Sequence, residues 1–309
     1  MELAIEARAL RKWYAGTRAV SDLSLSVRSG EVFGFLGPNG AGKTTSLKLL
    51  LGLVRPSGGE GSLLGAPIGD VKTRARIGYL PEHFRFHDWL SGRQLLHFHG
   101  RLCGMPRQRR NQRIEALLSR LGLEDAADRR VREYSKGMRQ RLGLAQALIN
   151  QPELVLLDEP TSGLDPLGRL LVRDVIREEQ RRGATVFLNS HLLGEVEVTC
   201  DRVAFIKRGR IVQERDLHAH AGGVEVALRL DRSSETLREG LSRFGEVRSC
   251  EGREVVLRVD SEEALPELTR WLAALGAGLF ELRRCSRSLE ELFLEIVGRE
   301  EGEGPWPES

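Results

Sequence analysis

The sequence lacks any long hydrophobic segment, although it has 309 residues. No apolar run approaches the ~18–20 residues that a helix needs to cross a bilayer, so we expect no membrane-spanning segment. The N-terminal residues Met1–Ala4 also lack the charged and then apolar regions of a signal peptide. Any role at a membrane is therefore expected to require a partner.

Cysteine and net charge are also scarce. The four cysteines are scattered without a CxxC pair or zinc-site spacing, which predicts reduced cytosolic thiols. They are Cys103, Cys200, Cys250 and Cys285. A net charge of +3 is too small to indicate nucleic-acid binding by itself. With 40% apolar and 29% charged residues, the chain is globular and long enough for one large or two ordinary domains.

A glycine-rich loop is the most informative segment. The apolar run Val32–Leu36 predicts a strand before it, and the pattern of Thr45–Leu53 predicts a helix after it. Strand, glycine loop and helix are the context of a phosphate-binding loop, because glycines let successive N–H groups turn around a phosphate. The helix N-terminus adds further donors and a partial positive charge. The loop consists of Gly37, Pro38, Asn39, Gly40, Ala41, Gly42, Lys43, Thr44 and Thr45.

Two side chains of this loop suit a nucleoside triphosphate. Lys43 can reach the β- and γ-phosphates, and the hydroxyl of Thr44 can bind Mg²⁺. The alternative is a glycine-rich turn that binds nothing, but such a turn would not need Gly-Lys-Thr at this spacing. The loop therefore predicts a nucleoside triphosphate site.

Two carboxylates follow a second buried strand. The continuous apolar run Leu154–Leu157 is typical of a central parallel strand, and Asp158 and Glu159 come directly after it. Ligands bind at this end of the strands in open α/β sheets. Asp158 suits the Mg²⁺ shell, and Glu159 suits orienting and deprotonating an attacking water. A helix N-cap is the ordinary alternative for such a pair, but the glycine loop favours the catalytic interpretation.

A second anion-binding segment precedes a predicted helix. Ser135 and the backbone of Gly137 lie within Tyr134–Met138, where a helix N-terminus can hold a phosphate. Taken alone, such a serine is simply a helix cap. The polar segment Ser162–Asp165, which follows Pro160, makes the functional interpretation stronger.

The remaining elements predict an α/β domain with a helical insertion. A strand is expected over Leu3–Leu10, followed by a loop that carries Trp13 and Tyr14. The insertion spans about residues 89–150 and is expected to contain helices 92–103, 106–121 and 138–150. Further elements are expected as strands 61–64 and 75–80, helix 167–182, strand 184–188 and a strand pair around 203–212.

The C-terminal part predicts a second, smaller domain. Gly222 and Gly223 mark the expected boundary. Beyond it the expected order is strand 224–230, helix 234–243, strands 246–250 and 253–259, helix 262–275, strand 278–283 and helix 288–297. This βαββαβ order predicts a ferredoxin-like α+β layer with one extra helix. We therefore expect domains at 1–220 and 221–299, followed by an acidic, frayed tail at 300–309.

At this point residues 1–215 clearly resemble the ATP-binding cassette (ABC) ATPases. The resemblance implies an α/β P-loop fold, a mixed sheet with an antiparallel part and a helical subdomain. Gly37–Thr45 resembles the Walker A loop and Leu154–Glu159 the Walker B strand, with Glu159 as catalytic base. Ser135–Met138 resembles the signature, and Ser162–Asp165 the loop that crosses the dimer.

Two further residues are assigned through the same resemblance. His191 matches the switch histidine that contacts the γ-phosphate, although a lone histidine after a strand is more often an ordinary loop residue. Tyr14 falls where the family stacks an aromatic ring on adenine. Trp13 is the second choice, and a core aromatic is the alternative.

The chain departs from the family pattern in two places. Tyr134, Lys136 and Met138 replace three residues of the usual signature Leu-Ser-Gly-Gly-Gln, while Ser135 and Gly137 are kept. Glu82 stands where the family usually has a glutamine that senses Mg²⁺ and the transmembrane partner. Glu82 can still hold Mg²⁺ through water. Both departures resemble a prokaryotic branch that mostly drives exporters, as does the segment 288–294.

The resemblance implies a functional homodimer that binds ATP and Mg²⁺ between its two copies. It also implies an integral membrane permease as partner, with this chain peripheral on the cytoplasmic face of the cell membrane. The alternative is a soluble ABC ATPase that acts on nucleic acid or ribosome-associated complexes. One cassette, no sustained heptads and no dense basic, aromatic surface in the C-terminal part argue against direct nucleic-acid binding.

Two regions allow more than one interpretation. The arginines of the helical insertion predict either a solvated helix face, which we favour, or a docking surface for anionic lipid or partner loops. They are Arg101, Arg107, Arg109, Arg110 and Arg113. The C-terminal domain is expected to stabilise the dimer, with a regulatory ligand-binding module as the alternative.

Overall fold

The chain divides into two compact units, residues 1–217 and 218–309. The computed structural model describes residues 2–83, 85–217, 224–232, 235–284 and 289–298. The expected boundary at Gly222 and Gly223 and the expected tail at 300–309 lie outside the described residues, as does Ser288. Among the helices that are described, none combines the length and the apolar character needed to cross a membrane.

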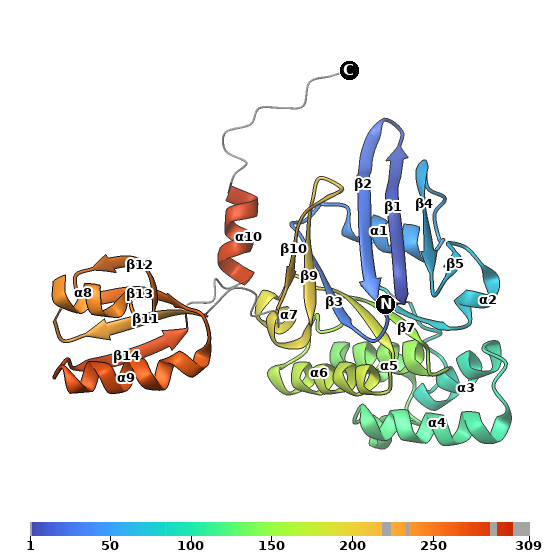
Figure 1. The fold of residues 1–309 in the computed structure, drawn as a ribbon. Helices are drawn as coiled ribbons and strands as arrows, with labels where there is room; N and C mark the ends of the chain where they lie inside the picture. The colour runs from blue at the N-terminus through green and yellow to red at the C-terminus, as the bar shows by residue number, and fades with distance from the viewer. Residues whose placement is uncertain (1, 84, 218–223, 233–234, 285–288, 299–309) are drawn as a thin grey trace. The chain divides into compact units, whose positions relative to one another are not determined.

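The first unit is built on a mixed sheet of ten strands within the described ranges, shown in Figure 1. Their order across the sheet is β5-β4-β1-β2-β10-β9-β3-β8-β7-β6. The strands are β1 (Leu3–Tyr14), β2 (Thr17–Arg28), β3 (Val32–Leu36), β4 (Gly58–Leu63), β5 (Ala66–Pro67), β6 (Ile77–Leu80), β7 (Leu154–Asp158), β8 (Thr185–Asn189), β9 (Arg202–Lys207) and β10 (Arg210–Asp216).

The parallel part of this sheet forms the centre of the unit. Strands β9, β3, β8, β7 and β6 pair in parallel, and every residue of β3, β7 and β8 is buried. The sequences of these strands are continuous apolar runs because helices cover both faces of a parallel sheet and bury both sides of each strand. The rings of Phe33, Phe35 and Phe187 pack together there. The carboxyl ends of β3, β6, β7 and β8 therefore meet at one edge.

The antiparallel part corrects one prediction. Strand β1 does not end at Leu10 but runs to Tyr14, so Trp13 and Tyr14 lie on a strand and not in a loop. They pair with Arg18 and Thr17 of β2 near the turn of the β1–β2 hairpin. The sequence did not indicate this extension because the end of the hairpin is exposed and its residues do not alternate between apolar and polar.

Helices complete the first unit. They are α1 (Lys43–Leu50), α2 (Val71–Arg74), α3 (Gly92–Leu102), α4 (Arg107–Arg120), α5 (Lys136–Leu148), α6 (Pro166–Arg181) and α7 (Leu193–Thr199). Short 3-10 turns lie at Glu124–Ala126 and Val131–Glu133. Helices α3, α4 and α5 contact one another and form the helical insertion, while α5 also packs on β6. Ser91 begins α3 with a capping box that includes Gln94.

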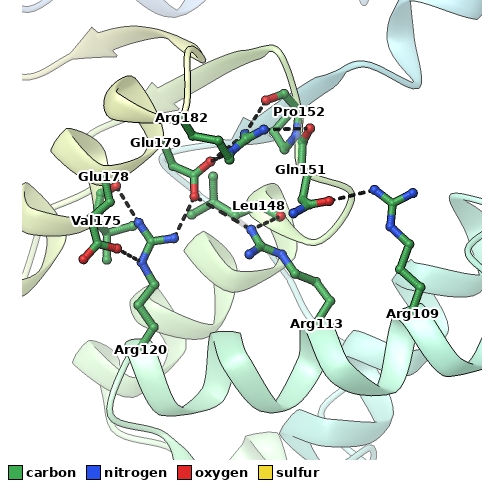
Figure 2. A network of polar contacts seen from close by, with 10 residues as sticks. All are labelled: Arg109, Arg113, Arg120, Leu148, Gln151, Pro152, Val175, Glu178, Glu179 and Arg182. Atoms are coloured by element: carbon green, nitrogen blue, oxygen red, sulfur yellow. Dashed lines mark hydrogen bonds and ion pairs between the residues drawn. The ribbon is translucent and has the colours of Figure 1, made fainter.

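A buried carboxylate fastens the insertion to the rest of the unit (Figure 2). Glu179 of α6 is almost fully buried and pairs with Arg120 of α4 at 2.7 Å and with Arg182 at 2.6 Å. Arg113 of α4 lies 3.7 Å from the same carboxylate and donates to the carbonyl of Leu148. Burial would raise the pKa of Glu179, but the hydrogen bonds from Arg120 and Arg182 outweigh burial and lower it.

This network changes the interpretation of the arginine cluster. Arg113 is largely buried against Glu179, Arg109 donates to the side chain of Gln151, and Arg110 donates to His97 and to the carbonyl of Met105. The favoured solvated helix face is therefore wrong for Arg113. Arg109 is exposed and Arg110 is half-buried, so for them both the solvated face and the docking surface stay predictions.

The second unit contains one antiparallel sheet among its described residues, with the order β12-β13-β11-β14. Helix α9 packs on β14, α8 packs on β12, and a core that includes Leu228, Leu257 and Leu268 lies between the sheet and the helices. The elements are β11 (Val224–Leu230), α8 (Glu235–Leu241), β12 (Gly245–Glu251), β13 (Glu254–Val259), α9 (Leu265–Ala274), β14 (Leu279–Arg284) and α10 (Leu289–Gly298). This βαββαβ order, followed by α10, gives the unit an α+β architecture.

Candidate active site

The glycine loop connects β3 to α1 at the carboxyl edge of the parallel sheet. Gly40 and Gly42 have φ values of 79° and 100°, a left-handed backbone that other residues rarely adopt. A Cβ atom at Gly37 would collide with the carbonyl oxygen of Ile206, and one at Gly42 with that of Ala19. Glycine is thus required at these positions by backbone shape or by close contact. The loop runs directly into the first turn of α1, so its N–H groups lie beside those of the helix N-terminus.

Lys43 lies at the centre of this loop. Its Nζ donates to the carbonyl of Gly37 at 2.6 Å and to that of Pro38 at 3.0 Å. Burial lowers the pKa of the Lys43 ammonium, while the negative charges of Glu159, Asp158 and Glu82 oppose that shift. The three acidic residues expected from the sequence are therefore close enough to Lys43 to act on its charge.

Asp158 ends β7 and is completely buried. Asn189, its neighbour on β8, donates its side-chain amide to Oδ1 of Asp158. Within the described part of the chain no group donates a hydrogen bond to Oδ2. Burial raises the pKa of the Asp158 carboxyl, and the charges of Glu82 and Glu159 raise it further. A buried carboxylate with an unpaired oxygen is suited to a cation.

Glu159 has an unusual backbone. Its φ is 53°, in the left-handed region. The N–H of Glu159 donates to the carbonyl of Asn189 at 2.8 Å, and its own carbonyl accepts from the N–H of Ser162 and the side chain of Gln140, both at 3.1 Å. Three hydrogen bonds thus fix the backbone of this one residue.

The side chain of Glu159 meets His191. Oε2 of Glu159 lies 2.7 Å from Nδ1 of His191, and the carboxylate is buried while 60% of the imidazole is exposed. The imidazole of His191 therefore holds one carboxylate oxygen of Glu159, and the backbone of Glu159 is itself fixed. The imidazole keeps an open side toward solvent.

The donor set fits Mg²⁺ together with a phosphate ligand. The described residues contain no group of three or more acidic, histidine or cysteine side chains that would hold a metal by themselves. Mg²⁺ is usually bound by one or two carboxylates together with substrate phosphates, and Oδ2 of Asp158 offers one unpaired oxygen. Thr44 lies in the first turn of α1. Glu82 follows β6, beside β7, with its side chain 46% exposed.

The second anion-binding segment lies at the start of α5. Ser135 caps this helix, and its Oγ accepts from the N–H of Met138 at 3.2 Å. Lys136 lies across Gly163, and Leu164 packs on Gly137, so the segments 135–138 and 162–165 contact each other. Among the described residues, no hydrogen bond or ion pair joins Ser135 or Gly137 to residues 37–45 of the same chain. Within one chain, the described contacts therefore do not bond this segment to the glycine loop.

Comparisons with known proteins show which family this chain belongs to. Residues 20–162 match the family model described as ABC transporter. An uncharacterized ABC transporter ATP-binding protein of Synechocystis sp. is 43% identical over 92% of this chain and 79% of the relative. Nod factor export ATP-binding protein I of Cupriavidus pinatubonensis is 38% identical over 96% of this chain and 91% of the relative. The chain belongs to the ABC transporter ATP-binding proteins.

A solved structure supports the fold. A dimeric ATP-binding cassette in a post-hydrolysis state with ADP and Pi aligns with a TM-score of 0.65 and 24% identity. The alignment covers 70% of this chain and 99% of the other. The expected P-loop cassette with a mixed sheet is thereby confirmed. As a member of this family, the chain is an ATPase and the ATP-binding subunit of an ABC transporter.

The other predicted residues of this ABC ATPase lie as follows. Tyr14 ends β1 with 43% of its surface exposed, and the Nζ of Lys12 lies 5.0 Å from its ring centre. Trp13 is exposed too, with Arg18 over its ring at 5.8 Å. Asp165 caps α6 by accepting from the N–H of Gly168 at 2.8 Å. Exposure argues against the alternative that either aromatic is a core residue.

Two residues that contact Asp158 and Glu159 were not among those predicted, namely Asn189 and Gln140. Asn189 binds Asp158 through its side chain and Glu159 through its backbone. A polar residue directly after the apolar run 184–188 was a usable signal for it. Gln140 gave no such signal, because its partner is a backbone carbonyl 19 residues away in the chain.

Proposed function

We propose that this chain hydrolyses ATP as a head-to-tail homodimer and thereby energises a separately encoded membrane permease, in the direction of export. Each ATP is bound by the Walker A loop of one copy and the signature segment of the other. The contact between Glu159 and His191, beside the unpaired oxygen of Asp158, is the observation that carries the proposal.

Binding is assigned to residues at the edge of the sheet. The N–H groups of the glycine loop and the ammonium of Lys43 bind the phosphates, and Lys43 exchanges its two loop carbonyls for phosphate oxygens. Thr44 and Asp158 would hold Mg²⁺, and Glu82 would assist them. When bound, this ion neutralises phosphate charge. Tyr14 stacks on adenine with its exposed ring.

Hydrolysis is assigned to Glu159 and His191. The carboxylate of Glu159 accepts a proton as a water attacks the γ-phosphorus, and the bond from that phosphorus to the β,γ-bridging oxygen breaks to give ADP and phosphate. His191 holds the carboxylate in place through Nδ1 and offers its exposed edge to the γ-phosphate. A buried carboxylate on a fixed backbone is effective here because it needs little reorganisation during the reaction.

The lack of a bond between the two phosphate-binding segments of one chain supports the two-copy arrangement. Ser135 and Gly137 present a helix N-terminus that has no bond to the glycine loop of their own chain. A second copy can bring this surface to the same triphosphate. ATP then binds the closed dimer better than the open one, and loss of the γ-phosphate lets the copies separate.

A groove beside the site is the proposed surface for the permease. It has a volume of about 150 Å³ and lies between the end of β6 and the helical insertion, lined by residues that include Tyr79, Phe86, His87 and Phe98. Phe98 is 40% exposed and the neighbouring Trp89 is 64% exposed. Exposed aromatic groups around a groove favour the binding of a short apolar segment from a membrane partner. The chain would thus be peripheral, on the cytoplasmic face of the membrane.

The proposed direction of transport rests on similarity to a relative, and the proposed accessory domain rests on the sequence. The relative named as a Nod factor export protein aligns over nearly the whole chain and favours the exporter direction. We assign residues 1–220 to the ATP-binding domain and 221–299 to an accessory domain that stabilises the dimer.

Protein dilution tests the homodimer. We expect the ATPase rate per chain to fall on dilution, because each site needs two copies. We also expect the Glu159→Gln variant to sediment as a dimer with ATP and Mg²⁺ and as a monomer without ATP. A rate per chain that is independent of dilution in a proven monomer would contradict the proposal.

A further inference from the structure

The start of helix α5 is bonded to the segment that contains the catalytic base. Gln140 lies in the second turn of α5 and is buried, and its Nε2 donates to the carbonyl of Glu159 at 3.1 Å. Two side-chain contacts run beside this bond, between Lys136 and Gly163 and between Gly137 and Leu164. The helix that carries Ser135 therefore holds the segment that carries Glu159 in the same chain.

The backbone of Glu159 needs such support. The left-handed region is unfavourable for a residue with a Cβ atom, so other contacts must hold it there. With φ at 53°, Glu159 keeps this conformation because its N–H is bound by Asn189 and its carbonyl by Ser162 and Gln140. Gln140 supplies the only one of these three bonds that comes from a side chain. It is therefore the one that a substitution can remove.

We propose that Gln140 is a positioning residue for Glu159. Its amide holds the carbonyl of Glu159 so that the carboxylate stays 2.7 Å from His191. This inference rests on the proposed function, in which Glu159 is the base. Because Ser135 caps the same helix, Gln140 also ties the base of one ATP site to the signature surface that serves the other site.

A purely structural role makes a different prediction. Buried amides are generally hydrogen-bonded, so Gln140 could serve only to satisfy its own polar atoms while α5 packs. In that case its loss would lower the melting temperature, or weaken ATP binding through a displaced Ser135, without a selective effect on the chemical step. A positioning role predicts a slower chemical step with unchanged ATP affinity.

The test compares two Gln→Met substitutions. Gln140→Met keeps the length of the side chain but removes the donor, and Gln112→Met makes the same change at an exposed position of α4. We would measure single-turnover ATP hydrolysis with protein in excess, KM and kcat in steady state, and the melting temperature. We expect Gln140→Met to hydrolyse ATP about tenfold more slowly with KM within about twofold of the parent, because small misplacements of a base are costly. Gln112→Met should match the parent.

A second measurement, of ATP-dependent dimerisation, tests whether the signature segment 135–138 still works. The double variant Gln140→Met, Glu159→Gln should still form an ATP-dependent dimer, as Glu159→Gln alone is expected to do. The positioning role would be overturned by an unchanged kcat or a raised KM in Gln140→Met. It would also be overturned if the dimer were lost only when Gln140 is replaced, or if Gln112→Met lost as much activity. Failure of the proposed function is distinguishable, because the parent chain itself would then show no dilution-dependent ATPase.

Discussion

Oε2 of Glu159 lies 2.7 Å from Nδ1 of His191, although the two residues are 32 positions apart in the chain. The contact forms because β7 and β8 are parallel neighbours, with Asp158 opposite Asn189, so that the residues after both strands emerge together. It combines the two residues to which we assign the chemical step.

Replacing the base should separate ATP binding from hydrolysis. We expect Glu159→Gln to bind ATP but to turn it over at least about a hundredfold more slowly, because the amide cannot accept the proton. Steady-state phosphate release and nucleotide binding would be measured on the same preparation. Glu197→Gln, at an exposed position of α7, is the control. Turnover near that of the parent would show that the base is misassigned.

Removing the buried charge of Asp158 should stabilise the nucleotide-free protein while it abolishes turnover. The pKa of Asp158 is raised by burial, so folding favours its neutral form, and this group adds stability as the pH falls through its folded pKa. Asp158→Asn is neutral at every pH and should raise the melting temperature at pH 7. Asp174→Asn, at an exposed position of α6, should have little effect. A lower melting temperature for Asp158→Asn would contradict this account.

Glu179 should anchor the helical insertion. We expect Glu179→Gln to lower the free energy of unfolding by about 3–5 kcal/mol, because it leaves the charges of Arg113 and Arg120 uncompensated in a buried place. Denaturant unfolding would measure this loss. Glu178→Gln, whose side chain is half exposed, should have a much smaller effect. Equal losses in the two variants would show that burial of the pair is unimportant.

The same residue predicts a pH dependence. Its pKa is lowered in the folded state, so its contribution is complete above the unfolded value of about 4.3 and is lost as the pH falls through the folded pKa. The difference in stability between the parent and Glu179→Gln should therefore shrink below about pH 4. A difference that stays constant down to pH 3 would exclude this origin of the effect.

The groove lined by Phe98 should bind the permease. We expect Phe98→Asp to reduce co-purification of the membrane subunit that the parent chain recovers, because a charge opposes burial of the apolar contact. Leu275→Asp, a similarly exposed site in the second unit, is the control, and the melting temperature of both variants checks folding. Equal recovery of the permease with Phe98→Asp would exclude the groove.

The sequence predicted the strands and loops that build the candidate site where these depend on short segments. Gly37–Thr45 and Leu154–Glu159 were found because a continuous apolar run before special residues marks a central strand and its end. Contacts between distant segments were not predictable in this way. Gln140 and Arg113 lie on helices with ordinary helical patterns, and only the packing of α5 and α4 shows that they bind Glu159 and Glu179.

Mixing two inactive variants tests the central proposal most directly. Lys43→Ala disables the glycine loop and Ser135→Arg disables the signature. Each homodimer should therefore have no working site. A mixed dimer has one intact site, formed by Lys43 of one copy and Ser135 of the other. We predict that the mixture hydrolyses ATP well above the sum of the separate variants. A mixture no more active than that sum would contradict a site shared between two copies.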